Sequence, residues 1–570
     1  MLMMKKIYLF LFAVFVCQIV SAQNNVIEDV RNVINKRGEA KILIPKNEVS
    51  NLNILANIIS LDYPKGDFWL GYVNNKQYNN FLTLNLKHSL YKETSNDKAL
   101  NMATTMSQMS NWDRYPTYQV YDSLMRRFAS SYPNICRLDT IGFSTNNRLL
   151  LCLKISSSPN QDIDKPKFCY SSTMHGDETT GIILLLRLSD WLLSNYGTDT
   201  RATNIVNNTQ VYINPIANPD GTYSGGNNTV SDATRYNANS VDLNRNYPDP
   251  VGGSHTDDEV WQPETLAFMA YADSNDFSLS ANLHGGAEVL NYPYDCYPSS
   301  TRNHADVDWF ESICKNFIDS IPSSAPSSLF TDVSASGYTD GGDWYTVSGG
   351  RQDYHTYFKH SREVTMEVST DKSLSTSSLN NYWTYLKGGL ISYIENCQKG
   401  IQGYIRDSST NEPIKAKVWI ENHDAYNSEI YSKSATGYYY RPILNGTYNI
   451  TYSADGYYSK TISNVTINPN SLINQDILLV RNENGLENIS DNNSNNFTIY
   501  PNPTKDILII SIPSSFNMEP STSYTIYNSL GITIEKGYIE NNNTNISVKN
   551  LNKGIYFVVI GAKVIKFIKE

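Results

Sequence analysis

The longest stretch of the chain alternates helix-like and strand-like patterns. Tyr118 to Ser131 and Ile182 to Leu193 have apolar residues at helical spacing, whereas the runs LLLCLKIS, KFCYSS and QVYINPIAN have the short apolar pattern of buried strands. Strands that are covered on both faces are apolar throughout, so this alternation predicts an α/β domain with a largely covered sheet. We place this domain at residues 109–397.

Two later segments have the pattern of small antiparallel β-sandwiches. Residues 398–480 contain the alternating runs GYIRD, AKVWIEN, YYYRPI, TYNITYSA and QDILLV, separated by turns rich in Gly, Asn and Asp. A linker rich in Asn, Ser and Asp is expected at 481–495. Residues 496–570 alternate again in FTIYPNP, DILIISI, SYTIYNS, GIYFVVI and VIKFIKE, which predicts a second sandwich.

The first part of the chain predicts a small α+β unit within residues 23–108. It has a helical pattern near Val26 to Asn35, a KILIP strand, a helix around Asn51 to Ile59 and an FWLGYV strand. The polar run from Thr94 to Met109 has no clear periodicity, and we expect it to be a linker.

The N-terminus has the layout of a cleaved secretory signal at residues 1–22. Lys5-Lys6 precede an apolar run from Ile7 to Val16, and the small residues Ser21-Ala22 stand before Gln23. A membrane anchor is the alternative, but the run is shorter than the roughly 20 residues that a spanning helix needs. We therefore expect a secreted or cell-surface protein with no transmembrane segment after signal removal.

Composition narrows the function classes. The chain has 570 residues, which indicates several domains, and its formal net charge of −10 gives no basic surface for a nucleic acid. Six of its seven cysteines follow the expected signal, and their wide spacing, without a Cys-x-x-Cys pair, does not indicate a thiolate zinc site. Core positions and occasional disulfides both remain open for them.

Two strand ends carry candidate metal ligands. His175-Gly176-Asp177-Glu178 follows the KFCYSS strand, so His175 and Glu178 have the spacing to bind one ion across a strand-to-helix turn. His284 ends the FSLSANLHGG run. A catalytic zinc ion takes about three protein ligands and keeps a position for water, a requirement that this set meets. For each histidine alone, a hydrogen-bonded structural role is the alternative.

Two further motifs have side chains suited to peptide chemistry. Arg245, beside Asn244 in VDLNRNYP, offers a planar guanidinium that binds a carboxylate through two hydrogen bonds. Glu367 lies in the strand EVTMEVS, where it alternates with apolar residues and is placed to face a pocket. A desolvated glutamate beside a metal ion makes a good general base. Surface salt bridges and a surface glutamate are the alternatives.

Taken together, the motifs from Trp112 to Cys397 resemble the zinc carboxypeptidase family, in particular its regulatory, basic-residue-specific branch. They are, in order, HGDE, NPDG, RYN, VDLNRNYP, QPET, NLHGG, NYPYD, WYTVSGG and TMEVS. The resemblance implies an α/β/α catalytic domain with a mixed sheet. Residues 398–480 resemble the transthyretin-like domain of the same branch. The segment 496–570, with IYPNPTKD near its start, resembles the C-terminal sorting domain of the type IX secretion system.

The resemblance also implies the role of each site residue. One Zn²⁺ ion would be bound by three side chains, a general base would act on the attacking water, and an arginine would stabilise the oxyanion. The substrate's terminal carboxylate would be held by two residues, covered by a tyrosine, and one carboxylate would orient a histidine ligand. The zinc ligands would be His175, Glu178 and His284, the base would be Glu367, and the arginine would be Arg235. Asn244 and Arg245 would hold the carboxylate, Tyr345 would cover it, and Asp242 would orient the histidine ligand.

Side-chain preference rests on two positions. Asp295, eleven residues after His284, and Gln352 match the basic-specific branch and imply a preference for C-terminal Lys or Arg through one buried charge pair. A loop-capping role for Asp295 is the alternative. Arg351 and His355 depart from that branch, and we expect them near the pocket.

The sequence thus predicts a secreted zinc carboxypeptidase that acts on peptide or protein C-termini. A hydrolase of γ-D-glutamyl or other cell-wall peptides on the same fold and a non-catalytic surface adhesin are the alternatives. Position suggests that the N-terminal unit is an inhibitory propeptide. The C-terminal domain implies the type IX secretion machinery as a partner.

Overall fold

The computed structural model describes residues 25–92, 100–482, 498–511, 523–528, 532–539, 541, 543–560 and 563–570. It divides into two compact units, one ending at Asn482 and one beginning at Glu483. The expected signal peptide and most of the expected linker at 481–495 lie outside the described residues. Among the helices that are described, none combines the length and the apolar character that a bilayer span requires.

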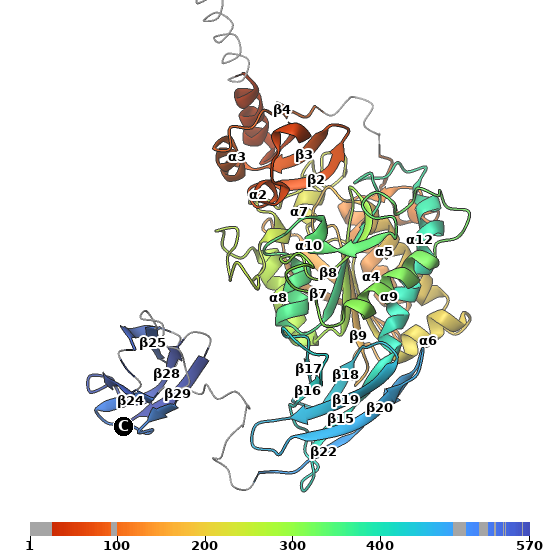
Figure 1. Cartoon of the computed structure of the whole chain (residues 1–570). Coiled ribbons are helices and arrows are strands. Elements are labelled where there is room, and N and C mark those ends of the chain that lie inside the picture. The colour runs from red at the N-terminus through yellow and green to blue at the C-terminus, as the bar shows by residue number, and fades with distance from the viewer. Residues whose placement is uncertain are drawn as a thin grey trace, which may run out of the picture. The chain divides into compact units, whose positions relative to one another are not determined.

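A mixed eight-stranded sheet forms the centre of the large domain (Figure 1). Its order is β13-β12-β14-β11-β9-β10-β8-β7, in which β14, β11, β9 and β10 are parallel neighbours. The predicted α/β fold with a mixed sheet is therefore confirmed. The strands are β7 (Cys136–Phe143), β8 (Leu149–Ile155), β9 (Lys167–Ser172), β10 (Gln210–Asn214), β11 (Leu279–His284), β12 (Glu288–Tyr292), β13 (Tyr338–Asp340) and β14 (Arg362–Val368).

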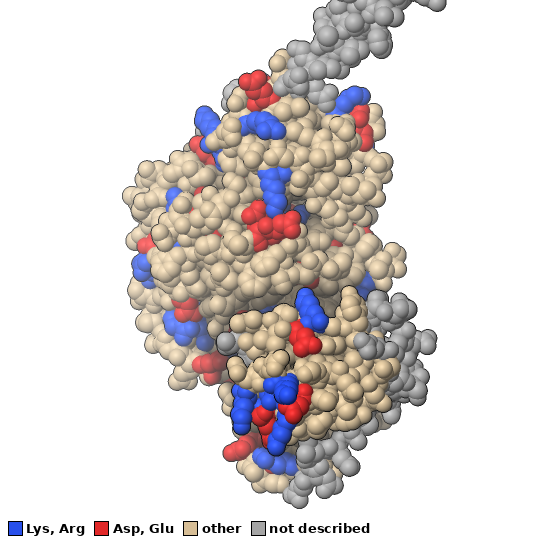
Figure 2. All heavy atoms as spheres, turned by 90° about the vertical axis from the view of Figure 1, so that its left-hand side faces the viewer, with Lys and Arg blue, Asp and Glu red and all other residues tan. Residues whose placement is uncertain are grey.

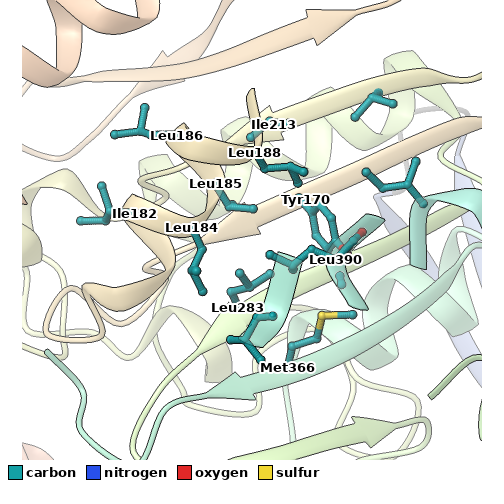
Figure 3. Close-up of a cluster of buried hydrophobic side chains, with 14 of the residues drawn as sticks. Tyr170, Ile182, Leu184, Leu185, Leu186, Leu188, Ile213, Leu283, Met366 and Leu390 are labelled. Atoms are coloured by element: carbon teal, nitrogen blue, oxygen red, sulfur yellow. Dashed lines mark hydrogen bonds between the residues drawn. The ribbon is translucent and has the colours of Figure 1, made fainter. Parts of the chain in front are cut away.

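Helices cover both faces of this sheet. Five of them share the main hydrophobic core, where the leucines of α5 pack towards Ile213, Leu283 and Met366 from three strands (Figure 3). On the opposite face, α8 packs against Cys152, Cys169 and Tyr212. The five core helices are α4 (Tyr118–Ser131), α5 (Thr180–Ser194), α6 (Thr200–Asn208), α9 (Val307–Asp319) and α12 (Leu379–Glu395), and α8 spans Pro263–Asn275.

The second face of β11 and β14 is polar although it is buried. Alternate residues of a strand point to opposite faces, so Leu279, Ala281 and Leu283 enter the main core while their neighbours face away from it. Those neighbours pair in parallel register, Ser280 with Glu363, Asn282 with Thr365 and His284 with Glu367. This polar ladder runs to the carboxyl edge of the sheet. Short helices lie near it: α7 (Pro219–Thr222), η3 (Leu243–Arg245), α10 (Gly341–Trp344), α11 (Arg351–Asp353) and the π-helix η4 (Tyr354–Phe358).

The N-terminal domain is an α+β unit with a core of its own. A helix covers residues 25–37, and the four-stranded sheet has the order β2-β3-β1-β4. The predicted helices and strands are present, and α3 is an addition that begins with an Asn74–Gln77 capping box. The elements are β1 (Ala40–Pro45), η1 (Lys46–Glu48), α2 (Leu52–Ala56), β2 (Ser60–Lys65), β3 (Phe68–Val73), α3 (Asn75–Leu82) and β4 (Ser89–Leu90).

Part of the expected linker at 94–109 is ordered. β5 (Met102–Ala103) pairs in parallel with β6 (Tyr115–Pro116), and η2 (Met106–Met109) follows it. Ala103 and Met109 are buried in the core of the catalytic domain. The linker interpretation is therefore wrong for residues 100–109, because two isolated apolar anchors fix this stretch without any helical or strand periodicity.

Two four-stranded sheets form the sandwich after the catalytic domain, with the order β18-β15-β21, where β22 also pairs with β15, and the order β17-β16-β19-β20. Arg362 of β14 and Arg441 of β18 both bind the buried Asp306 carboxylate, at 2.6 and 2.8 Å. This ion cluster joins the two domains. The strands are β15 (Gly400–Asp407), β16 (Lys417–Ile420), β17 (Ile430–Tyr431), β18 (Tyr438–Arg441), β19 (Gly446–Ser453), β20 (Lys460–Ile467), β21 (Leu472–Asn474) and β22 (Ile477–Leu479), preceded by η5 (Asn396–Gln398).

The second unit is the other predicted sandwich, with sheets β23-β24-β27 and β26-β25-β28-β29 around a small core. Its strands are β23 (Thr498–Tyr500), β24 (Ile507–Ser511), β25 (Ser523–Asn528), β26 (Thr533–Tyr538), β27 (Asn543–Ser547), β28 (Gly554–Ile560) and β29 (Lys563–Lys569).

The six described cysteines are all free thiols, and five of them are buried. Those five lie in the hydrophobic cores, which is one of the two roles that the sequence allowed. On the face drawn in Figure 2, basic and acidic side chains lie scattered among uncharged ones, often next to each other.

Candidate functional site

Nine of the eleven predicted site residues line one cavity. It lies at the carboxyl edge of the parallel strands β9, β11 and β14. Open α/β sheets commonly bind ligands at this edge, in the crevice that forms where neighbouring strands connect to helices on opposite faces of the sheet. The remaining two, Asp242 and Gln352, contact residues of this cavity from behind. The nine are His175, Glu178, Arg235, Asn244, Arg245, His284, Asp295, Tyr345 and Glu367.

A close backbone contact sets the turn that carries the first two candidate ligands. His175 and Glu178 lie between β9 and α5, and Gly176 stands between them. A Cβ atom at Gly176 would lie 2.3 Å from the carbonyl carbon of Gly221, in the NPDG motif. Only glycine fits here, because the HGDE turn packs directly against the backbone of the NPDG motif.

Hydrogen bonds fix the orientation of both histidine rings. His175 Nε2 lies 3.1 Å from Asp242 Oδ1, and the other oxygen of that carboxylate accepts a 3.0 Å bond from Arg235 Nε. An ionised carboxylate only accepts, so His175 carries its proton on Nε2 and presents a lone pair on Nδ1. His284 Nε2 lies within hydrogen-bond distance of Asn282 Oδ1. Asp242 thus contacts the His175 ring on the side away from Glu178.

The donor set fits a divalent cation. His175 Nδ1 and His284 Nδ1 lie 3.0 Å apart, and they lie 2.9 and 2.8 Å from the two oxygens of Glu178. Each of these nitrogen and oxygen atoms directs a lone pair towards the others. Their mutual repulsion would be relieved by a cation bound between them. Although burial opposes it, nearby positive charge, including that of Lys372, holds the pKa of Glu178 well below its usual range. Two histidines and one glutamate are a zinc ligand set of catalytic type.

Glu367 lies beside this group. It is the register partner of His284 across β11 and β14, while Val364, Met366 and Val368 are fully buried on the opposite face. Its Oε2 atom is buried, and no described residue forms a hydrogen bond to it. Burial and the Glu178 carboxylate raise the pKa of Glu367 well above its usual range, a shift that a bound cation would oppose. The side chain is placed to accept a proton inside the cavity.

Asn244 and Arg245 present donors to the cavity from η3. Asn244 Oδ1 accepts a 2.9 Å bond from the backbone N–H of Arg351, so its amide N–H groups remain for another acceptor. Arg245 Nη1 donates to the carbonyl oxygen of Asn244, at 2.9 Å, which fixes the guanidinium beside it. A carboxylate is the ligand that this pair of donors suits.

An acidic group lies deeper in the cavity. Asp295 is 3% exposed, and its Oδ1 accepts a 2.9 Å hydrogen bond from Gln352 Nε2. Burial, followed by the charge of Asp353, raises the pKa of Asp295 well above its usual range. An uncompensated buried carboxyl group of this kind favours a cationic ligand.

Arg351 and His355 do not line this cavity, which corrects the expectation that they lie at the pocket. Arg351 is 1% exposed and points away from the carboxyl edge, towards the start of β14, where its Nε lies 3.2 Å from Glu363 Oε1. The buried His355 ring lies 3.8 Å from the same carboxylate. The residues next to them in the sequence line or border the pocket, but Arg351 and His355 both point along the same face of the sheet to Glu363, away from the carboxyl edge.

The N-terminal domain supplies residues that sequence patterns missed. Leu61 and Asp62 of β2 line the same cavity, whose volume is about 40 Å³, room for water but not for an amino-acid residue. Ser60 Oγ donates a 2.6 Å bond to Asp242. Tyr345 packs against the core of this domain. The domain therefore closes the site.

Lys372 is a second missed residue, and it connects the N-terminal domain to the candidate ligands. Its Nζ lies 2.9 Å from Glu178 Oε1, 3.5 Å from Asp62 Oδ2 and 4.5 Å from the centre of the Tyr72 ring. Asp62 and Tyr72 have no motif around them, and Lys372 follows Glu367 by five residues without any pattern of its own.

Two other groups of described residues have metal-ligand composition, but other donors occupy them. In the group Asp306, His423 and Asp424, the guanidinium of Arg441 binds both carboxylates, at 2.8 and 2.6 Å. In the group Asp249, Cys296 and Asp353, backbone N–H groups donate to both carboxylates. In the His175 group Lys372 also donates to Glu178 Oε1, but both histidine Nδ1 atoms still face the Glu178 carboxylate directly, at 2.9 and 2.8 Å.

Two parts of the chain match known protein families. Residues 121–387 match the family described as zinc carboxypeptidase, and residues 498–570 match the secretion system C-terminal sorting domain. Carboxypeptidase D of Homo sapiens is 34% identical over 385 residues, which cover 64% of this chain and 27% of that protein. Carboxypeptidase M of Mus musculus is 32% identical over 355 residues, covering 59% of this chain and 77% of that protein.

Among solved structures, thrombin activatable fibrinolysis inhibitor aligns with a TM-score of 0.47 and 17% identity, over 63% of this chain and 99% of that one. The chain spans little more than a quarter of the length of the carboxypeptidase D proteins that it matches.

Proposed function

Because the chain belongs to the zinc carboxypeptidase family, we propose that it hydrolyses the C-terminal peptide bond of peptides or proteins. The observation that carries this proposal is the single cavity in which a cation site, the Glu367 base and the Asn244–Arg245 carboxylate binder meet. A free C-terminus bound by that pair has its last peptide bond directed towards the cation site.

Each residue then has one task in the reaction. The ion, when bound, supplies Lewis acidity towards water and the scissile carbonyl. Glu367 accepts a proton from the attacking water and passes it to the leaving amine as the C–N bond breaks. Arg235, 3.6 Å from Glu178, stabilises the negative charge that develops on the carbonyl oxygen. Tyr345, whose pKa burial raises to about 12, keeps its hydroxyl proton and can donate to the substrate.

The preferred substrate ends in Lys or Arg. This finer proposal is supported by Asp295, a buried carboxyl group in the same cavity, together with Gln352, which orients it. A bound ammonium or guanidinium would compensate the buried carboxylate, whereas an apolar side chain would leave it unpaired.

Release of the last residue from otherwise identical peptides tests this function. Peptides ending in Arg, Lys, Phe or Glu are incubated with protein whose N-terminal domain has been released, with zinc and then with a chelator. We expect chelator-sensitive release that zinc restores, fastest for Arg and Lys. Release from muropeptides alone would favour the cell-wall hydrolase, and no release from any substrate would contradict an enzymatic role.

We also propose that the N-terminal domain keeps the enzyme latent. Support comes from Asp62, which reaches into the cavity, and from Tyr345, which packs against this domain instead of covering a substrate. Access by a peptide requires that the domain move away.

The sorting-domain match supports export through a type IX secretion machinery. A reporter fused to residues 483–570 would test this in a host that has such a system. Delivery of the reporter to the cell surface or medium is expected, and retention inside the cell would contradict the proposal.

A further inference from the structure

A buried polar network lies directly behind His284 and has no part in the reaction described above. It follows the polar ladder of β11 and β14, where Ser280 pairs with Glu363 and Asn282 pairs with Thr365. Asn282 and Glu363 are 1% and 0% exposed. Buried polar groups are costly unless they are fully bonded, so such a network needs a structural or functional reason.

The orientation of the Asn282 amide is fixed by its neighbours. Its Nδ2 lies 2.9 Å from Glu363 Oε1 and 3.2 Å from Thr365 Oγ1. A carboxylate only accepts hydrogen bonds, so the NH₂ group of the amide must face Glu363. The amide oxygen is thereby turned towards the Nε2 atom of His284.

The orientation of the Asn282 amide determines the tautomer of the His284 ring. An amide oxygen also only accepts, so Nε2 of the neutral ring must carry the proton and Nδ1 must carry the lone pair. Nδ1 is the atom that lies 2.8 Å from Glu178 Oε2, at the cation site. A reversed amide would favour the opposite tautomer and turn a proton towards the metal.

Arg351 holds the far end of the network. Its guanidinium lies 3.2 Å from Glu363 Oε1, donates to Ser171 and stacks 5.1 Å over the ring of Phe268. The other groups facing Glu363 are Ser280, whose hydroxyl donates at 2.6 Å, and the ring of His355. The positive charge of Arg351 keeps Glu363 an acceptor in a fully buried place.

We propose that Asn282, held by Glu363 and Arg351, is a positioning residue that sets the ring tautomer of His284 and thereby its affinity for the metal. His175 is set directly by the Asp242 carboxylate, whereas His284 is set through a neutral amide. The amide keeps a further negative charge away from a site that already contains Glu178 and Glu367. The proposal rests on the zinc role proposed for His284.

Three variants test it in the full chain. Asn282→Leu removes the acceptor and keeps the branched shape and the number of side-chain heavy atoms. Asn282→Asp combined with Glu363→Gln exchanges the amide and the carboxylate, so that residue 282 again accepts from His284. Ser280→Ala is the matched control. Ser280 lies on the same strand as Asn282, and its replacement removes a buried hydrogen bond to Glu363 but leaves the Asn282 side chain unchanged. The readouts are the ¹⁵N shifts of labelled histidines in metal-free protein and zinc affinity by competition with a chromophoric chelator.

We expect the Nε2–H tautomer of His284 in the wild type, the control and the double variant, and zinc affinities within about threefold of each other for the wild type and the control. Asn282→Leu should mix the tautomers and weaken zinc binding by about 10–100-fold. The proposal is overturned if Asn282→Leu keeps the wild-type tautomer, or if it loses no more zinc affinity than Ser280→Ala. Neither readout depends on peptide cleavage, so an inactive wild type would reject the proposed function separately.

Discussion

Ser60 of the N-terminal domain donates a 2.6 Å hydrogen bond to Asp242, the carboxylate that also receives the ring N–H of His175. The covering domain therefore contacts the support of a candidate metal ligand as well as the mouth of the cavity. Tyr236 extends the contact, because its hydroxyl donates to Gln77 at 2.7 Å. The docked domain and the ordered site share one hydrogen-bond network.

Release of the N-terminal domain should raise activity. A specific protease site placed between residues 92 and 100, followed by cleavage and size-exclusion separation, would remove residues that block the cavity. We expect kcat/KM on a peptide ending in Arg to increase by about 10-fold or more, equivalent to about 1.4 kcal/mol. The same protease applied to the unaltered chain is the control. Equal activity before and after release would reject latency.

Asp295→Asn should change the substrate preference. Removing one partner of a buried charge pair costs about 2–5 kcal/mol, so kcat/KM for a C-terminal Arg should fall by about 30-fold or more. A peptide ending in Phe should change by less than about threefold, since no charge pair is lost. Asp343→Asn, an exposed acidic neighbour on α10, is the control. An equal loss for both peptides would point to a structural role for Asp295.

Docking of the N-terminal domain should weaken as the pH rises. Burial, together with Asp177, raises the pKa of Glu39 from 4.5 to about 7. A carboxyl group whose pKa is raised in the docked state stabilises that state while it is protonated. The contribution of Glu39 to docking is therefore complete below about pH 4.5 and is lost as the pH rises through about 7. The change is at most about 1.4 kcal/mol per pH unit.

Thermal unfolding of the full chain between pH 5 and 8 measures this contribution. Glu39→Gln should flatten the pH dependence of the first transition, whereas Glu28→Gln, at an exposed position, should not. An unchanged slope in Glu39→Gln would show that another group is responsible.

Gly176→Ala should disturb the site through its backbone. The added methyl group would lie 2.3 Å from the carbonyl carbon of Gly221, so the turn between His175 and Glu178 must shift. We expect a loss of about 1–3 kcal/mol in the free energy of unfolding, with reduced zinc content. Gly554→Ala, where the nearest atom is 3.8 Å away, is the control. Wild-type melting temperature and zinc content in Gly176→Ala would contradict the close-contact explanation.

Much of the fold and of the site followed from local patterns. The predicted helix Tyr118–Ser131 has the bounds of α4, because its apolar spacing and the Thr117 cap act within one segment. The candidate ligands converge because His175 follows the end of β9 and His284 is the last residue of β11, two strands that pair directly in parallel. Strand ends in a parallel sheet lie at one edge, so sequence position translated into proximity.

The contacts that were missed depend on pairing between distant segments. Asp62 and Lys372 meet only because two separately folded domains dock, and no periodicity along the chain encodes that surface. Arg351 follows the WYTVSGG motif directly, which predicts a place near the pocket, but its partner Glu363 lies four residues before Glu367 on the same strand, away from the carboxyl edge. The burial of that polar face required the structure.

The most direct test of the central claim is the effect of Glu367→Gln on a peptide ending in Arg, in protein whose N-terminal domain has been released. Glutamine keeps the shape of the side chain but cannot accept the proton, and a general base contributes about 100- to 10,000-fold to the rate. We expect kcat to fall within or beyond that range while bound zinc, measured by elemental analysis, stays at one ion per chain. A zinc-loaded variant with wild-type kcat would contradict the assignment of this cavity as a carboxypeptidase active site.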